Sequence, residues 1–145
     1  MKEALPVLLF CVYMACVFHI TLMPFVSGMK LAFADDGYNF NLNLVPYIDV
    51  IRQKGNYSRQ VILNILLFVP FGLLYPLIRK TTLLKTVLYG FCLSLSIEIL
   101  QFFFTVRIAD VTDLINNTAG AFIGAVSYSV LYRILCLFRD GADRG

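Results

Sequence analysis

The chain has 145 residues, of which 59% are hydrophobic and 14% are charged, and its formal net charge is +3. Soluble domains usually carry about 25% charged residues. The composition therefore indicates a membrane protein rather than a soluble domain with a large core. The net charge is small, and no basic stripe is interleaved with aromatic residues, so we expect no nucleic-acid partner.

The cysteines and the single histidine give no sign of a metal site. All four cysteines, Cys11, Cys16, Cys92 and Cys136, lie in apolar segments, and their spacing matches neither a zinc site nor a redox motif. One histidine, His19, is too few for a multi-histidine metal centre. The sequence therefore predicts neither a metal nor a cofactor.

The first apolar segment, residues 5–26, is about as long as a helix that spans a bilayer. A cleaved signal peptide is the alternative, and its only small-residue cleavage pattern would be residues 26–28. The length of the apolar stretch favours a retained helix. In the long polar connection that follows, Tyr47–Lys54, ended by Gly55, predicts a short helix at the membrane surface, with a plain loop as the alternative.

Three further apolar segments, 60–78, 83–104 and 114–138, predict three more spans. Pro70 and Gly72 lie within the second span, where neighbouring helices can satisfy the backbone groups that a proline frees. We therefore predict an all-α polytopic membrane protein with four transmembrane helices, a short interfacial helix, and one domain over residues 1–145.

The third and fourth predicted spans each carry polar and small residues at spacings of three and four, which places them on one helix face. On the third span these residues are Gly90, Ser94, Glu98, Gln101 and Thr105; on the fourth they are Asp113, Asn117, Gly120, Gly124 and Ser127. Gly120 and Gly124 form a small-xxx-small pair, which lets another helix approach closely.

Basic residues predict the orientation of the spans. Arg79, Lys80 and Lys85 lie in the short second connection, and Arg139 and Arg144 lie near the C-terminus. Short basic connections favour the cytoplasm. We therefore expect both termini to be cytoplasmic.

With this alternation the strongly polar residues of all four spans fall in the outward half of the membrane. A charged side chain in an apolar span costs about 3 kcal/mol on insertion scales, so Glu98 must have partners. We therefore predict one outward-facing polar site, to which the spans contribute His19, Asn64, Glu98, Gln101, Asp113 and Asn117.

Four sequence motifs follow one another in the chain. They are NLVPY at 43–47, N-x5-PFG-x3-P from Asn64 to Pro76, S-x-x-x-E-x-x-Q from Ser94 to Gln101, and R-x-x-D-x-x-D-x-x-x-N-x-x-G from Arg107 to Gly120. In this order and spacing the chain resembles the VanZ-like family of bacterial membrane proteins. The family usually has phenylalanine where this chain has Tyr47, which keeps the aromatic ring and adds a hydroxyl.

The resemblance implies a multi-pass protein of the bacterial cytoplasmic membrane. The founding member of the family is associated with resistance to the glycopeptide teicoplanin, and relatives are linked to reduced susceptibility to glycopeptides and lipoglycopeptides. No reaction comes with the resemblance, so whether the chain is an enzyme stays open.

The polar residues support two interpretations each. Glu98 and Asp110 are candidate catalytic acids or bases, with a helix–helix hydrogen bond and a helix N-cap as the alternatives. Arg107 is a candidate anion-binding residue, with an ion pair to Asp110 or Asp113 as the alternative. The remaining candidates for substrate binding are Asn64, Gln101, Asp113 and Asn117, and the candidates for a structural role are Pro70, Gly72, Gly120 and Gly124.

Three functional hypotheses follow. The first is a protein that alters the response of the cell envelope to glycopeptide antibiotics, as the resemblance implies. The second is a membrane enzyme that acts on a lipid-linked or amphipathic substrate from the outer leaflet. The third is a non-catalytic module that binds a partner helix through Gly120 and Gly124. The expected partners are membrane lipids, a lipid-linked or lipoglycopeptide ligand, and an oligomer or partner helix.

Overall fold

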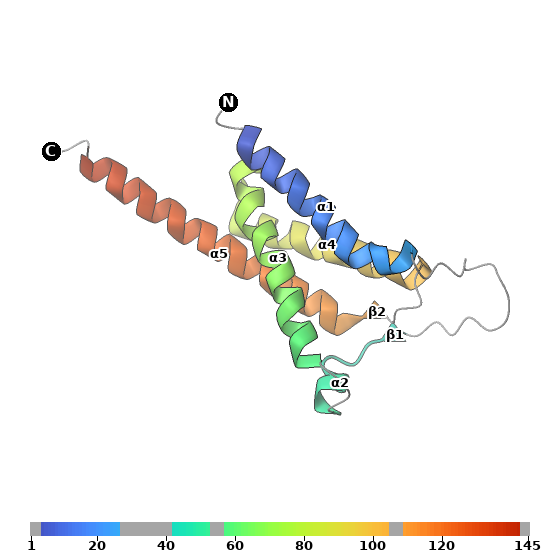
Figure 1. Cartoon of the computed structure of the whole chain (residues 1–145). Coiled ribbons are helices and arrows are strands. Elements are labelled where there is room, and N and C mark those ends of the chain that lie inside the picture. The colour runs from blue at the N-terminus through green and yellow to red at the C-terminus, as the bar shows by residue number, and fades with distance from the viewer. Residues whose placement is uncertain (1–3, 27–41, 53–56, 105–108, 143–145) are drawn as a thin grey trace, which may run out of the picture.

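The computed structural model describes residues 4–26, 42–52, 57–104 and 109–142 (Figure 1). In these residues the chain is almost entirely helical, which confirms the all-α prediction. The elements, in chain order, are α1 (Ala4–Val26), β1 (Leu42–Asn43), α2 (Ile48–Ile51), α3 (Tyr57–Arg79), α4 (Leu83–Phe104), β2 (Ala109–Asp110) and α5 (Val111–Ala142).

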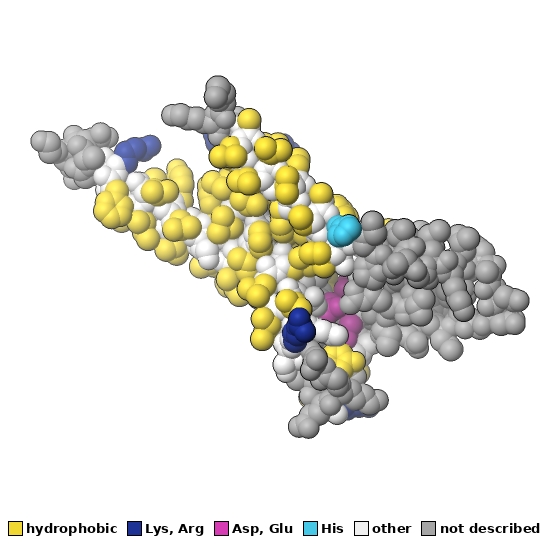
Figure 2. Space-filling model, viewed as in Figure 1, with side chains coloured by type: hydrophobic (Ala, Val, Ile, Leu, Met, Phe, Trp, Pro, Cys, Tyr) yellow, Lys and Arg dark blue, Asp and Glu magenta, His cyan; other side chains and the backbone are white. Residues whose placement is uncertain are grey.

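Four of these helices, α1, α3, α4 and α5, are long and apolar enough to cross a membrane. The 23 residues of α3 are about 35 Å long at 1.5 Å per residue, against a hydrocarbon core of about 30 Å. Large apolar side chains stay exposed on all four helices, and they cover much of the described part of the face in Figure 2. A helix that is apolar all round is typical of a membrane span. The protein is therefore a multi-pass membrane protein.

The predicted surface helix is described in part. Of the described residues 47–52, Ile48–Ile51 form a helical turn, α2, whereas residues 53–55 lie outside the described residues. Just before it, β1 pairs in parallel with β2, so that Leu42 is opposite Ala109 and Asn43 is opposite Asp110. This two-residue bridge was not predicted. It attaches the long first connection to the beginning of α5.

The closest helix contact is the crossing of α3 and α5. A Cβ atom at Gly120 would overlap the carbonyl oxygen of Ile65, and one at Gly124 would overlap that of Val69. On the other helix, a Cβ at Gly72 would lie 2.7 Å from the backbone nitrogen of Ala125. Small residues at a membrane helix crossing allow this backbone approach. The helix that the glycine pair of α5 admits is therefore α3 of the same chain.

Aromatic rings join α1 to the C-terminal half of α3. The ring centroid of Phe10 on α1 lies 5.9 Å from those of Phe71 and Tyr75, and these two rings of α3 stack with their centroids 5.2 Å apart. Tyr13 donates a hydrogen bond from its hydroxyl to the carbonyl oxygen of Leu67 at 2.9 Å. Apolar contacts and this partly buried hydrogen bond thus pack helix α1 onto α3.

The turn between α3 and α4 is closed by local hydrogen bonds. Lys80 has a φ of 48°, and its backbone nitrogen donates to Pro76 at 3.0 Å, which is a left-handed helix C-cap. Thr82 precedes α4, and its hydroxyl accepts a hydrogen bond from the nitrogen of Lys85. The turn makes α3 and α4 antiparallel, and it lies at the same end of the bundle as the beginning of α1 and the end of α5 (Figure 1).

Because the α3–α4 turn and the end of α5 lie at the same end of the bundle (Figure 1), they should lie on the same side of the membrane. Reporter proteins fused after Lys80 and after Gly145 should report the same side of the membrane, and the basic residues of the turn predict the cytoplasm. Alkaline phosphatase should be inactive and green fluorescent protein fluorescent at both positions. Opposite results at the two positions would refute the four-span arrangement.

Candidate functional site: a buried polar network

Buried polar side chains gather where α1 and α4 end and α5 begins. This end of the bundle is opposite the α3–α4 turn (Figure 1). One buried polar residue, Thr86, lies near that turn instead. The other buried polar residues that the structure describes, with the part-buried polar side chains at the same end, form the polar network. The buried members are Thr21, Ser94, Glu98, Gln101, Thr112, Asn116 and Asn117, and the part-buried members are Asn43, Tyr47, Asn64, Asp110 and Asp113.

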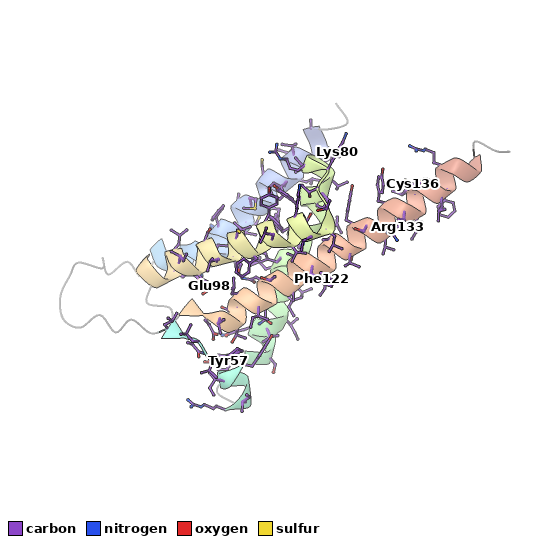
Figure 3. The ribbon with its side chains drawn as sticks, turned by 180° about the vertical axis from the view of Figure 1, so that it is seen from behind. Tyr57, Lys80, Glu98, Phe122, Arg133 and Cys136 are labelled. Carbon is purple, nitrogen blue, oxygen red and sulfur yellow. The ribbon has the colours of Figure 1, made fainter. Side chains whose placement is uncertain are left out.

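Glu98 is the buried carboxylate of the network. Its side chain is 8% exposed, and Figure 3 shows it on α4 beside α5. Its Oε2 atom accepts a hydrogen bond from the backbone nitrogen of Asp110 at 3.2 Å. A buried carboxylate needs such donors, because burying an unpaired charge is very costly. The start of α5 therefore helps to hold Glu98 within the bundle.

Asp110 joins three parts of the chain. Its Oδ1 atom accepts from the backbone nitrogen of Thr112 at 2.7 Å, which makes Asp110 the N-cap of α5. Its Oδ2 atom accepts from the side-chain nitrogen of Asn43 at 3.1 Å. One oxygen of Asp110 thus caps α5, as the sequence allowed, while the other binds a residue 67 positions earlier in the chain.

Tyr47 fastens the first connection to α5. Its φ is 57°, a left-handed conformation that is unusual for a bulky residue. Its backbone nitrogen donates to the hydroxyl of Thr112 at 3.0 Å, and its own hydroxyl donates to Oδ1 of Asn116 at 2.9 Å. These contacts hold the backbone in place. The hydroxyl that distinguishes this chain from the usual phenylalanine is therefore a member of the network.

The other candidate residues pair across helices. Asn64 of α3 donates to Oδ1 of Asp113 on α5. Asn117 donates to the hydroxyl of Ser94 on α4 at 2.9 Å. Gln101 of α4 donates to the carbonyl oxygen of Thr21 on α1 at 3.0 Å. These bonds join all four long helices at one end of the bundle.

The expected contact of Glu98 with Asn64, Asn117 or Arg107 stays a prediction. The amide nitrogens of Asn64 and Asn117 bind Asp113 and Ser94 rather than Glu98. The other expected partner of Glu98, Arg107, lies outside the described residues. His19 is exposed on α1, outside the network.

Sequence reasoning missed two contributors from the first connection, Asn43 and Tyr47. Both lie in the NLVPY motif, which is the signal that marks them. It also missed that Asn116, not only Asn117, faces inward; the two are 2% and 5% exposed. Asn116 Nδ2 and Asn117 Oδ1 are buried without a hydrogen-bond partner among the described residues. A buried polar atom without a partner costs about 1–3 kcal/mol, so this pair is a place where a polar ligand atom or water would stabilise the protein.

The chemistry available here is that of carboxylates and amides. Within the described part of the chain, no three histidine, cysteine, aspartate or glutamate side chains are grouped as metal ligands usually are. Glu98 and Asp110, joined through a backbone hydrogen bond, are groups that can accept or donate protons or hold a cationic group.

Comparison with known proteins agrees with the sequence motifs. The model of the VanZ/LLP1 family matches residues 10–133 of this chain. The chain belongs to the VanZ/LLP1 family. The matched range contains every described residue of the polar network. All four motifs that carry the resemblance meet in this network, the second of them through the bond of Asn64 to Asp113.

A relative within this family is Protein VanZ of Enterococcus faecium, which is 37% identical to the chain over 91 residues. The aligned part is 62% of this chain and 53% of that VanZ protein, so the chain spans about half the length of this relative. No solved structure matches the chain.

Proposed function

We propose that this protein alters the susceptibility of the cell envelope to glycopeptide and lipoglycopeptide antibiotics, and that it acts through the polar network at the outward end of the bundle. Membership in the VanZ/LLP1 family supports the first part of this proposal. If both termini are cytoplasmic, as the basic residues predict, the network lies in the half of the membrane that faces away from the cytoplasm. These antibiotics reach their targets from that side.

One observation carries the second part of the proposal. Glu98 is buried at 8% exposure within an apolar bundle and accepts a hydrogen bond from the residue that caps the next helix. Helix packing alone does not need a carboxylate there, because small residues already bring α4 close to α5: a Cβ at Gly90 would lie 2.6 Å from the Cβ of Ala121. Ionisable residues within membrane spans usually have a function.

The test is complementation of a deletion strain, read as the minimal inhibitory concentrations of teicoplanin, vancomycin and a lipoglycopeptide. Glu98→Gln keeps the size and hydrogen-bonding capacity of the side chain and removes its charge. We expect this variant to lose the resistance that the wild-type chain restores, while its membrane level stays unchanged. Ser96→Ala is the matched control, because Ser96 is exposed on the same helix and its hydroxyl donates to the carbonyl oxygen of Cys92 within that helix.

Full resistance with Glu98→Gln would count against a functional role for the carboxylate. No effect of deletion on any of the three antibiotics would contradict the proposed function itself. The membrane level of each variant, measured by immunoblot, separates both outcomes from a loss of protein.

A membrane enzyme is the second candidate, and the placing of Glu98 and Asp110 on the lining of one pocket favours it. Two carboxylates at one site suit proton transfer to and from a lipid-linked or amphipathic substrate, which typically contributes about 10²–10⁴-fold to a rate. In this hypothesis Arg107 would hold a phosphate of the substrate. Purified membranes with Glu98→Gln should then accumulate the unmodified lipid substrate, as seen by mass spectrometry of lipid extracts.

The hypothesis of a partner helix bound through Gly120 and Gly124 has less support. Both glycines are buried against α3 of the same chain. A partner helix would need another surface.

A further inference from the structure

An apolar pocket adjoins the polar network. It has a volume of about 260 Å³ and lies between the outward end of α4 and the beginning of α5, under the β1 segment. Apolar side chains make its wall on three segments: Leu42 and Leu44 around β1, Leu95 and Ile99 on α4, and Leu114 on α5. Val111, Glu98 and Asp110 complete the lining.

The pocket is built by the contacts that attach the first connection to α5. The parallel bridge of β1 with β2 and the bond of Asn43 to Asp110 hold Leu42 and Leu44 beside it. Of the lining residues, Leu95 and Ile99 are 38% and 47% exposed on α4, where a bilayer would surround them. The α4 side of the pocket therefore adjoins lipid chains.

The size of the pocket limits what can enter. Pockets for whole drug-sized molecules usually measure about 300–1,000 Å³. A pocket of 260 Å³ with an apolar wall suits one hydrocarbon chain rather than a whole glycopeptide.

A second, polar recess begins at the same aspartate. Asp110 also lines a space of about 10 Å³ with Asp113, Tyr57 and Gln60, at the beginnings of α3 and α5. A space of this size holds about one water-sized group. Two carboxylates and the phenols of Tyr47 and Tyr57 around it favour a small group that is positively charged or rich in hydrogen-bond donors, such as an ammonium.

Any preference of the site for one ligand over the surrounding lipids must come from the polar recess. Lipid chains are as apolar as leucine side chains, so a hydrocarbon chain gains little by leaving the bilayer for the pocket. A hydrogen bond to a charged group in a place shielded from water gives a preference of about tenfold or more.

We propose that the apolar pocket and the polar recess together bind a single-chain amphiphile with a cationic amine head, its hydrocarbon chain beside Leu95, Ile99 and Leu114 and its amine at Asp110 and Asp113. This assigns a ligand class to the site of the proposed function and so rests on it. The assay is direct binding to purified protein, so either proposal can fail without the other.

The experiment uses the full chain in phosphatidylcholine nanodiscs and two photoreactive probes. Both probes carry the same long alkyl chain with a mid-chain diazirine; one ends in a primary amine and the other in a hydroxyl. Peptide mass spectrometry locates the crosslinks. We expect the amine probe to label peptides with Leu95, Ile99 and Leu114 about tenfold more than the hydroxyl probe does.

Three variants test the two ends of the ligand. Asp110→Asn keeps an N-cap residue and should bring labelling by the amine probe down to the level of the hydroxyl probe. Leu114→Trp should fill the pocket and remove labelling there by both probes. Leu95→Trp makes the same test from the lipid-facing side of α4, so a folding defect of one variant does not decide the result.

Leu131→Trp is the control, because Leu131 is 51% exposed on the distant half of α5. Labelling that is spread evenly over the lipid-facing surfaces, or that is equal for both probes in the wild-type chain, would overturn the proposal. Unchanged pocket labelling in both folded tryptophan variants would also overturn it.

Discussion

Gly124→Leu should prevent the bundle from forming, because it removes the close approach of α5 to α3. A Cβ at this position would overlap the carbonyl oxygen of Val69 and lie 2.9 Å from the Cα atom of Gly72. Those neighbours are backbone atoms, which cannot move aside as a flexible side chain can. We therefore expect little folded protein in detergent extracts.

A graded series makes the prediction quantitative. Overpacking of a well-packed core typically costs about 1–3 kcal/mol, so Gly124→Ala should lower the stability by about that amount and Gly124→Leu by more. The measurements are the yield of monodisperse protein by size-exclusion chromatography and the midpoint of thermal unfolding.

Ala15→Leu is the matched control for this series. Ala15 is exposed on α1, so a larger side chain there meets lipid rather than backbone. Its yield and unfolding midpoint should equal those of the wild-type chain. Wild-type stability of Gly124→Leu would show that α3 and α5 do not cross at these glycines.

Asp110→Ala should produce the second large effect, because Asp110 holds the beginning of α5 and the first connection together. The alanine variant loses the N-cap bond to Thr112 and the bond from Asn43. Loss of an N-cap costs about 0.5–2 kcal/mol, and loss of a hydrogen bond to a charged group costs about 1.5–3 kcal/mol. We expect a loss of about 2–5 kcal/mol in the free energy of unfolding, together with faster proteolysis of residues 42–52.

Asp110→Asn separates the structural role from a role in the site. Asparagine is about as good an N-cap as aspartate, so most of the stability should remain. If Asp110 has a charge-dependent function, the asparagine variant should fold and still fail to complement the deletion strain. Equal stability of Asp110→Ala and the wild-type chain would mean that the two hydrogen bonds of this carboxylate do not stabilise the fold.

The sequence by itself determined the four membrane helices and their order. The thickness of a bilayer and the rise of an α-helix set the length of a span, and α1, α3, α4 and α5 follow directly from the apolar runs. Helical spacing also determined that Ser94, Glu98 and Gln101 share the inner face of α4, where they are 0%, 8% and 5% exposed. Both inferences rest on local geometry that is the same in any membrane helix.

Only the tertiary structure decided how the polar groups pair. Asn43 meets Asp110 across 67 positions, and Tyr47 meets Asn116 across 69, and no periodic pattern relates residues of an irregular connection to a helix. Several amides and carboxylates lie at a similar depth in the membrane, so the sequence allows many pairings among them. Side-chain direction and backbone register decide which pairings form. The same limit applied to the glycine pair of α5: its small size predicted a close helix, but only packing of the whole chain identified that helix as α3.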